Sequence, residues 1–292
     1  MRKYSKLSAY YEATKPRVTY GNVLTVVAGY LFAVAGAIHV QTLLAVTLGM
    51  TLVIASACVV NNYLDQDIDK LMERTKKRPS VLGALSTSNL LWFASSLFVF
   101  GFFILEIFTN FHVVIAALAG YVTYVWLYGA LSKRRSIHGT LVGSISGAMP
   151  IVAGYFAGRD SLDIGALIVF LIIFFWQFPE FYSIAIYRRH EYKAAHIPVF
   201  PVVKGVPRTI RAILTYTILY VIATLSVVVA GLAGWTYALV MAGFGGYWMY
   251  LAVLGLRAPV TQHDQWARRM FRFSMITILV VCALLSVGRV LP

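Results

Sequence analysis

Nine apolar runs of about twenty residues decide what this chain of 292 residues can fold into. A helix of roughly 20 apolar residues crosses the approximately 30 Å hydrocarbon core of a bilayer. The chain is 60% apolar and 12% charged, whereas soluble domains average about 45–50% and about 25%. We therefore predict an all-α integral membrane protein that forms one polytopic domain over residues 1–292. The predicted spans are 18–38, 42–60, 89–109, 112–131, 138–157, 162–183, 210–231, 236–256 and 273–291.

Positive charge falls on alternate connecting segments. The sequence has 25 Lys and Arg against 11 Asp and Glu, a formal net charge of +14. With nine spans, every Lys and Arg lies on one side except Arg159 and Arg289. Cytoplasmic loops carry the excess of Lys and Arg, so we predict a multi-pass protein of the cell membrane with a cytoplasmic N-terminus and an outside C-terminus. Nucleic-acid binding is not expected, because the cations flank spans and form no separate basic module.

The first long cytoplasmic connection carries acids at four-residue intervals. It continues the second span without Gly or Pro until Pro79, which predicts one helix projecting from the membrane. The residues along one face of that helix are Asn61, Asp65, Asp69 and Glu73, with Asn62 three residues before Asp65. Carboxylates completed by waters and substrate phosphate are the usual ligands of Mg²⁺. The stripe predicts a diphosphate site, and a solvated helix face with Asp67 off the stripe is the alternative.

Two further acids lie in and just after the sixth predicted span. Glu191 is at its mouth, and Glu180 precedes it by eleven residues. Eleven residues return to nearly the same helix face, so both acids could line one cavity about 16 Å apart on a straight helix. A carboxylate as deep as Glu180 is costly unless it is paired or faces water. We interpret Glu180 as functional, and a protonated Glu hydrogen-bonded to a neighbouring helix is the alternative.

A basic cluster closes the fourth span on the same predicted side. It runs from Tyr128 to Arg135 and includes Lys133 and Arg134, which can bind phosphate oxygens or serve only as topology anchors. Lys15 and Asn22, at the start of the first span, allow the same two interpretations. Acids and cations at the ends of lipid-facing helices favour a ligand with an anionic headgroup and an apolar tail.

Four sequence blocks occur in a fixed order. They are Lys15-Pro16-Arg17, Asn61-Asn62-x-x-Asp65-x-x-x-Asp69 followed by Arg74-Thr75, Trp176-Gln177-x-Pro179, and Ile197-Pro198-Val199-x-Pro201-Val202-Val203-Lys204-Gly205. From about residue 10 to residue 273, the chain resembles the UbiA-type intramembrane prenyltransferases and, among them, the branch that farnesylates haem b. The resemblance implies a bundle of nine transmembrane helices with a central cavity open to the cytoplasmic side.

The resemblance also implies a reaction and roles for residues. Members of the branch transfer farnesyl from farnesyl diphosphate to a vinyl group of haem b, and water completes the hydroxyethylfarnesyl side chain of haem O. Mg²⁺ is the implied cofactor, haem b is a substrate, and haem A synthase or terminal oxidase subunits are the further partners suggested. The implied catalytic residues are Asp65, Asp69, Glu191 and Lys133, and the implied metal ligands are Asp65, Asp69, Asn62 and Glu191. The implied substrate-binding residues are Asn22, Asn61, Asn62, Arg74, Tyr128, Arg134, Glu180 and Lys204.

The sequence departs from the pattern of the branch at two positions and leaves two other functions to consider. Glu191 stands where the branch usually has Asp, and Glu180 stands where it usually has His. A UbiA-type enzyme with an aromatic acid or quinone precursor as acceptor is the nearest alternative, but such relatives more often carry a second acid where this chain has Ala195. A transporter would place coupling acids near the midplane, whereas most acids here lie at one membrane face.

Overall fold

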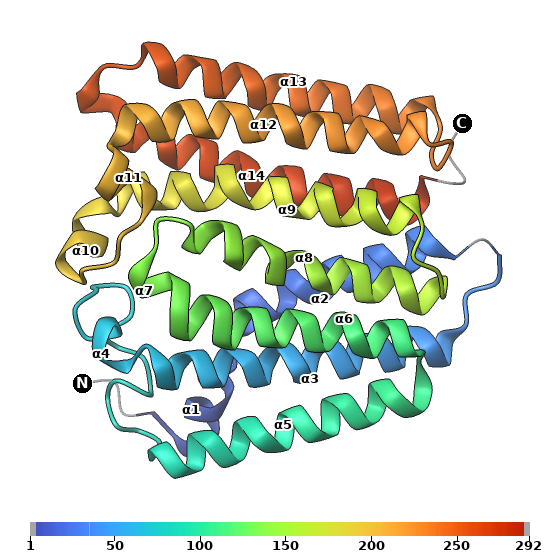
Figure 1. Cartoon of the computed structure of the whole chain (residues 1–292), viewed down its shortest axis with the longest axis horizontal. Coiled ribbons are helices and arrows are strands. Elements are labelled where there is room, and N and C mark those ends of the chain that lie inside the picture. Colours follow the sequence, from blue (N-terminus) through green and yellow to red (C-terminus); the bar gives the residue numbers. More distant parts are fainter. Residues whose placement is uncertain (1–3, 35, 289–292) are drawn as a thin grey trace.

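The computed structural model describes residues 4–34 and 36–288, and in those residues all regular secondary structure is helical. Nine long rods run side by side (Figure 1). They are α2 (Pro16–Ala33), α3 (Val40–Leu64), α5 (Thr87–Phe108), α6 (Phe111–Val122) continued by the π-helix η1 (Thr123–Ser132) and α7 (Lys133–Arg135), α8 (Gly139–Gly158), α9 (Ile164–Tyr187), α12 (Val206–Val229), α13 (Trp235–Arg257) and α14 (His263–Val287). The short helices are α1 (Lys6–Ala13), α4 (Gln66–Asp69), α10 (Arg189–Ala194), α11 (Phe200–Lys204) and the 3₁₀ turn η2 (Val260–Gln262).

The rods match the nine predicted spans. Of those in the described part of the chain, 8 are long and apolar enough to cross a membrane, and α2 is the exception. Its 18 residues include Arg17 and Asn22, which lower its mean hydropathy. It nevertheless packs against α3, α8 and α14 within the bundle.

Two predicted boundaries were wrong. The first span was predicted to end at residue 38, but α2 ends at Ala33, and the hydroxyl of Tyr30 bonds to the backbone of His39 in the connection that follows. The last span was predicted to begin at residue 273, whereas α14 begins at His263. The first turns of α14 carry three arginines, Arg268, Arg269 and Arg272, so they are not an apolar run, although the opposite face buries Trp266 and Met270. The predicted end of this span, residues 289–291, lies outside the described residues.

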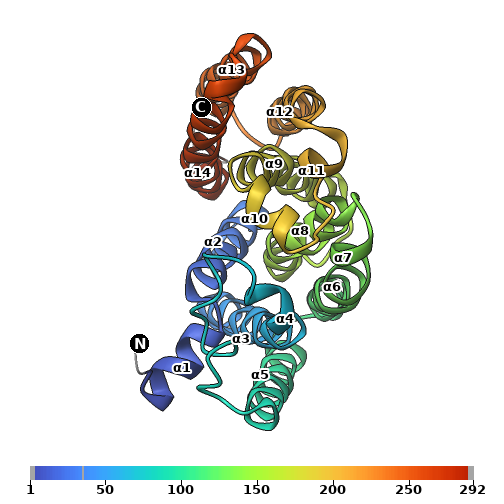
Figure 2. The ribbon, with the colours of Figure 1, turned by 90° about the vertical axis from the view of Figure 1, so that its left-hand side faces the viewer.

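The functional segments gather at one end of the bundle. α1, α4, α7, α10 and α11 all lie at the left in Figure 1, and the C-terminal end of α14 lies at the opposite end. Figure 2 looks onto this end and shows α4, α7, α10 and α11 over the ends of the long helices. We call it the site end.

Hydrogen bonds from one turn of α9 tie it to two neighbouring helices. Trp176 Nε1 donates to the carbonyl of Ser274 in α14, and Gln177 Nε2 donates to that of Ser144 in α8, each at 3.0 Å. Gly147 makes room for the second contact, because a Cβ there would lie 2.0 Å from Gln177 Oε1. Small residues at such crossings let membrane helices approach closely.

Candidate active site

The acidic stripe does not lie on one continuous helix. α3 ends at Leu64, Asp65 adopts φ −95° and ψ 3°, and α4 covers only one turn. Arg134 Nη2 donates to the Leu64 carbonyl and so satisfies one of the acceptors that a helix end leaves free. The stripe continues to Asp69, whose N–H donates to the Asp65 carbonyl at 2.8 Å. Glu73 lies outside it, since its side chain is 76% exposed and pairs only with Lys76.

Each acid of the turn around Asp65 faces a cation. Lys133 Nζ donates to the buried Asp65 carboxylate, and Arg78 donates to that of Asp69. Arg134 binds both oxygens of Asp67 at 2.6 and 2.7 Å and lies 4.0 Å from Asp65. The Arg134 hydrogen bond holds the pKa of Asp67 at about 2. The site therefore neutralises its own carboxylates.

The π-helix η1 places aromatic rings beside these charges. Tyr124 and Tyr128 stack with ring centroids 5.8 Å apart, and Lys133 Nζ lies 5.9 Å from the Tyr128 centroid. The Tyr124 hydroxyl lies 3.5 Å from Asn61 Oδ1. π-Helical turns are rare and occur frequently at functional sites.

The turn between α1 and α2 adds a buried amine. Lys15 has a left-handed backbone with φ 51°, and its ammonium donates to Asn61 Oδ1. Burial lowers the pKa of Lys15 to about 8. Asn62 Nδ2 donates to the Ala13 carbonyl at 2.8 Å and fixes this turn against α3. Asn22 lies farther along α2 and donates to the Val18 carbonyl of its own helix.

The second acidic segment also begins at a helix break. α9 ends at Tyr187, Arg188 adopts φ −111° and ψ 13°, and Glu191 lies in the separate helix α10. The prediction that Glu180 and Glu191 share one straight helix was therefore wrong. Arg188 pairs with Glu191 at 2.7 Å, and an ion pair between Arg189 and Asp264 holds the turned segment against α14.

Apolar side chains join the two acidic segments. Ile68 and Met72 from the first form a buried cluster with Ala195 and Ile197 from the second. Tyr192 packs on this cluster, and burial raises the pKa of its hydroxyl. A pocket of about 310 Å³ opens between the segments. It is lined by Asp67, Ile68, Leu71, Arg134, Ala195, His196 and Ile197.

The remaining predicted residues lie less close to the acids. Arg74 is exposed, and it interacts electrostatically with Tyr128 and Tyr192. Lys204 ends α11, and its side chain makes no hydrogen bond or ion pair with the described residues. Two further cations contact the stripe: Lys15, which the sequence analysis had offered as a candidate, and Arg78, which it had not. The signal for Arg78 was its place in the basic run before Pro79.

The donor atoms at the site end fit a hard cation. In the part of the chain that the structure describes, no three His, Cys, Asp or Glu side chains already converge as a metal site. Three buried carboxylate or amide oxygens of the described residues, however, accept no hydrogen bond: Asp65 Oδ1, Asn62 Oδ1 and Glu191 Oε2. Carboxylate and amide oxygens are the ligands that Mg²⁺ takes together with substrate phosphate.

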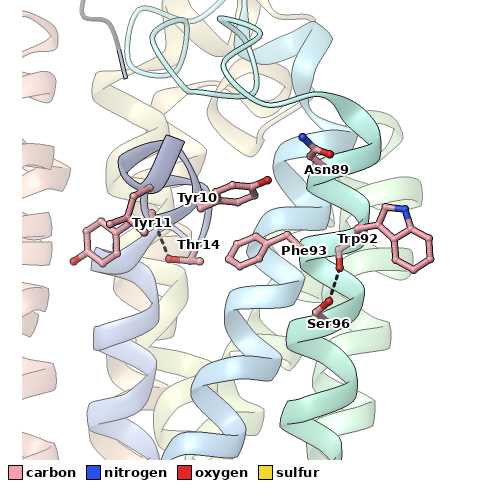
Figure 3. Close-up of a pocket in the computed structure, with 8 residues that line it drawn as sticks. Tyr10, Tyr11, Thr14, Asn89, Trp92, Phe93 and Ser96 are labelled. Carbon is pink, nitrogen blue, oxygen red and sulfur yellow. Dashed lines mark hydrogen bonds between the residues drawn. The ribbon is translucent and has the colours of Figure 1, made fainter. Parts of the chain in front are cut away.

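A second pocket lies away from the acids. It has a volume of about 560 Å³ and opens between α1 and α5 (Figure 3). Its lining residues are Leu7, Tyr10, Tyr11, Thr14, Asn89, Trp92, Phe93 and Ser96. Tyr10 and Phe93 meet edge to face at 4.9 Å. None of the lining residues is ionised at neutral pH, so this groove does not offer a diphosphate site.

Comparison with known proteins identifies the family. The model of the UbiA prenyltransferase family matches residues 22–276. The chain belongs to this family. It is 42% identical over 281 residues to Protoheme IX farnesyltransferase of Yersinia pseudotuberculosis serotype O:1b, covering 96% of this chain and 95% of that one. It is 44% identical over 281 residues to the protein of that name from Pseudomonas savastanoi pv. phaseolicola, with the same coverage.

Solved structures share the fold of this UbiA-family protein. A digeranylgeranylglyceryl phosphate synthase superposes with a TM-score of 0.81 at 20% identity, over 97% of this chain and 98% of that one. A UbiA homologue from Archaeoglobus fulgidus bound to GPP and Mg²⁺ gives 0.71 at 16% identity, over 96% and 100%. The predicted all-α membrane fold and the UbiA resemblance are thus confirmed, and the chain is a multi-pass membrane protein.

Proposed function

We propose that this UbiA-family protein is a Mg²⁺-dependent protohaem IX farnesyltransferase, which transfers farnesyl from farnesyl diphosphate to a vinyl group of haem b and yields haem O. The observation that carries the proposal is the 42–44% identity, over nearly the whole of both chains, to proteins with that name. The residue at position 195 also supports the proposal. It is Ala195, an apolar residue that packs on Ile68 between the two acidic segments. An enzyme for an aromatic or quinone acceptor would more often carry an acid there.

The acidic segments are proposed to hold the metal and the diphosphate between them. Asp65 and Asp69, with Asn61 or Asn62, would provide ligands on one side, and Glu191 on the other. The buried oxygens of Asp65, Asn62 and Glu191 that accept no hydrogen bond support this assignment. When bound, Mg²⁺ would neutralise the diphosphate and stabilise the charge that builds up as the C–O bond breaks.

The basic residues are proposed to exchange partners when substrate binds. Lys133 and Arg134 now neutralise Asp65 and Asp67, and the arriving diphosphate would take their hydrogen bonds. Preorganised donors of this kind stabilise developing negative charge. The faces of Tyr124 and Tyr128 would stabilise the allylic cation through their π electrons.

The outer polar residues are proposed to guide substrate to the site. Arg74 and Lys204 are exposed at the site end and would draw in the anionic headgroup. Asn22 would contact the substrate from α2, below Lys15. The central cavity between the helices would open at this same end.

The whole chain, residues 1–292, is proposed to form one domain in the cell membrane. The site end would face the cytoplasm, since nearly all Lys and Arg lie there. The N-terminus would then be cytoplasmic and the C-terminus outside, in agreement with the opposite positions of α1 and the end of α14 (Figure 1). A haem A synthase or a terminal oxidase subunit would receive the product.

One reaction tests the proposal. Purified protein in detergent is given Mg²⁺, haem b and farnesyl diphosphate, and the haem products are separated and weighed by mass spectrometry. We expect haem O in a one-to-one ratio with released diphosphate. Folded protein that forms no haem O in this reaction would contradict the proposal.

A further inference from the structure

Glu180 carries a carboxyl group inside the membrane-spanning helix α9, and it is not among the residues proposed to bind the metal or the diphosphate. It precedes the end of α9 at Tyr187 by seven residues, which places it about 10 Å below the site end. Its side chain is partly buried, and it has no hydrogen bond or ion pair with any described residue. Because an isolated carboxylate at this depth is costly, its presence needs a reason beyond packing.

Two neighbours on α9 fix the direction in which Glu180 projects. Trp176 faces α14 through its bond to Ser274, and Gln177 faces α8 through its bond to Ser144. At about 100° per residue, Glu180 lies about 40° from Trp176 and about 60° from Gln177, between the two directions. The carboxyl group therefore points between α8 and α14, toward α2, which packs against both helices.

Glu180 thus points into the bundle at a level deeper than the site end, where the acids that would hold the diphosphate lie. A prenyl diphosphate anchored at Asp65 extends its carbon chain from the site end into the bundle, so the carbon that reacts lies on the inner side of the diphosphate. Lys133, Arg134 and Arg78 are engaged with the carboxylates at the site end, whereas no cation pairs with Glu180. An unpaired carboxylate below the reacting carbon is free to accept a proton.

We propose that Glu180 is the general base that activates the water molecule completing the hydroxyethyl group of the product. This inference rests on the proposed function. A proton acceptor is required because water must add to a carbon cation, and oxygen must lose a proton when it does so. General-base catalysis typically contributes about 10² to 10⁴ in rate.

The step balances as follows. The C–O bond of farnesyl diphosphate breaks and its electron pair leaves with the diphosphate. The π electrons of the vinyl group form the new C–C bond to farnesyl C1, which leaves a cation on the vinyl carbon attached to the macrocycle. A water oxygen bonds to that carbon while one of its protons passes to the Glu180 carboxylate, which later releases it to water.

The test separates farnesyl transfer from hydration. Wild-type protein, Glu180→Gln and Glu106→Gln are each given Mg²⁺, haem b and farnesyl diphosphate in H₂¹⁸O, and diphosphate and haem products are quantified by mass. Glu106 is the matched control, because it is another Glu in a membrane-spanning helix, α5, but is exposed. Wild type and Glu106→Gln should give haem O that carries one ¹⁸O.

Glu180→Gln should still release diphosphate, but its yield of haem O per diphosphate should fall by about 10²-fold. The product should instead be lighter than haem O by one water, because a cation that is not hydrated loses a proton to form an alkene. If the Gln variant does not fold, Glu180→Met replaces it, because a membrane helix accepts the apolar Met side chain. The same two yields, of diphosphate and of haem O, are then compared.

Three results would overturn the inference. An unchanged yield of haem O per diphosphate in the Glu180 variant would show that no base is needed there. Equal losses of haem O and of diphosphate release would show that Glu180 serves binding or folding instead of hydration. A wild-type protein that forms no haem O refutes the proposed function and this inference together, whereas the first two results leave the proposed function standing.

Discussion

Removing the ammonium group of Lys133 tests whether Lys133 and the buried Asp65 form an ion pair that stabilises the fold. Lys133 donates to Asp65, whose side chain is 1% exposed, while that of Lys133 is 17% exposed. Lys133→Met keeps most of the volume of the side chain and removes its charge. The Asp65 carboxylate is then left in a buried position, with Arg134 at 4.0 Å as its nearest remaining cation.

The structure sets the size of the effect. Removing one partner of a fully buried ion pair costs about 3–5 kcal/mol. Arg134 offsets part of this cost here, so we expect Lys133→Met to lower the free energy of unfolding by about 2–3 kcal/mol. Asp65→Asn should cost only about 1 kcal/mol, because Lys133 can turn toward water. The double variant carries no unpaired charge and should cost about as much as Asp65→Asn alone.

The assay is a double-mutant cycle on the free energy of unfolding. Each variant is unfolded reversibly by adding sodium dodecyl sulfate to protein in a non-ionic detergent, and helical circular dichroism is followed. We expect a coupling free energy of about 2–3 kcal/mol between the two positions. A value below about 0.5 kcal/mol, which is the additivity error for independent sites, would refute the reasoning that the two groups form a buried pair.

Three further results are expected. Asp69→Ala should abolish haem O formation. Glu73→Ala should leave it near the wild-type rate, because Glu73 is exposed and pairs only with Lys76. Equal turnover in the two variants would contradict the assignment of Asp69 to the site. Gly147→Ala should lower the free energy of unfolding by about 1–3 kcal/mol, since its Cβ would overlap Gln177 Oε1. Gly243 has open space around it, so Gly243→Ala should leave the free energy of unfolding unchanged or raise it in the same titration. Chelation of Mg²⁺ with EDTA should stop diphosphate release, and added Mg²⁺ should restore it; turnover that persists in EDTA would exclude the proposed cofactor.

Hydropathy predicts the rods of this protein because lipid leaves few alternatives. Backbone polar groups in a bilayer must be paired internally, so an apolar run of about twenty residues becomes a helix. The same criterion fails where a helix is amphipathic. The first turns of α14 carry cations on one face and bury Trp266 on the other, and a search for apolar runs overlooks them.

The helix breaks at the site end could not be predicted from local sequence. Nothing between Asn61 and Pro79 is a strong helix breaker, so a continuous helix was the simplest expectation. At the break before Asp65, the Leu64 carbonyl accepts a hydrogen bond from Arg134, which is distant in the sequence. The residue types of the stripe were therefore predictable, but the cation that each acid meets was not.

The contacts of Lys15 and Arg78 could not be predicted either, because their partners come from distant segments. Lys15 reaches Asn61 only because its own backbone is left-handed and turns α1 away from α2. A lysine followed by proline does not indicate such a conformation, since the residue before proline usually prefers an extended one. Arg78 was one of several cations in its segment, and only the fold selects it for Asp69.

The central claim, that the two acidic segments hold a metal and a diphosphate between them, is tested most directly by a structure of the protein with Mg²⁺ and a non-reactive thio analogue of farnesyl diphosphate. We predict metal density within coordination distance of Asp65 and Glu191, with Lys133 turned from Asp65 to a diphosphate oxygen. The contrary result is a Lys133–Asp65 ion pair that persists with the analogue bound elsewhere, for instance in the groove between α1 and α5.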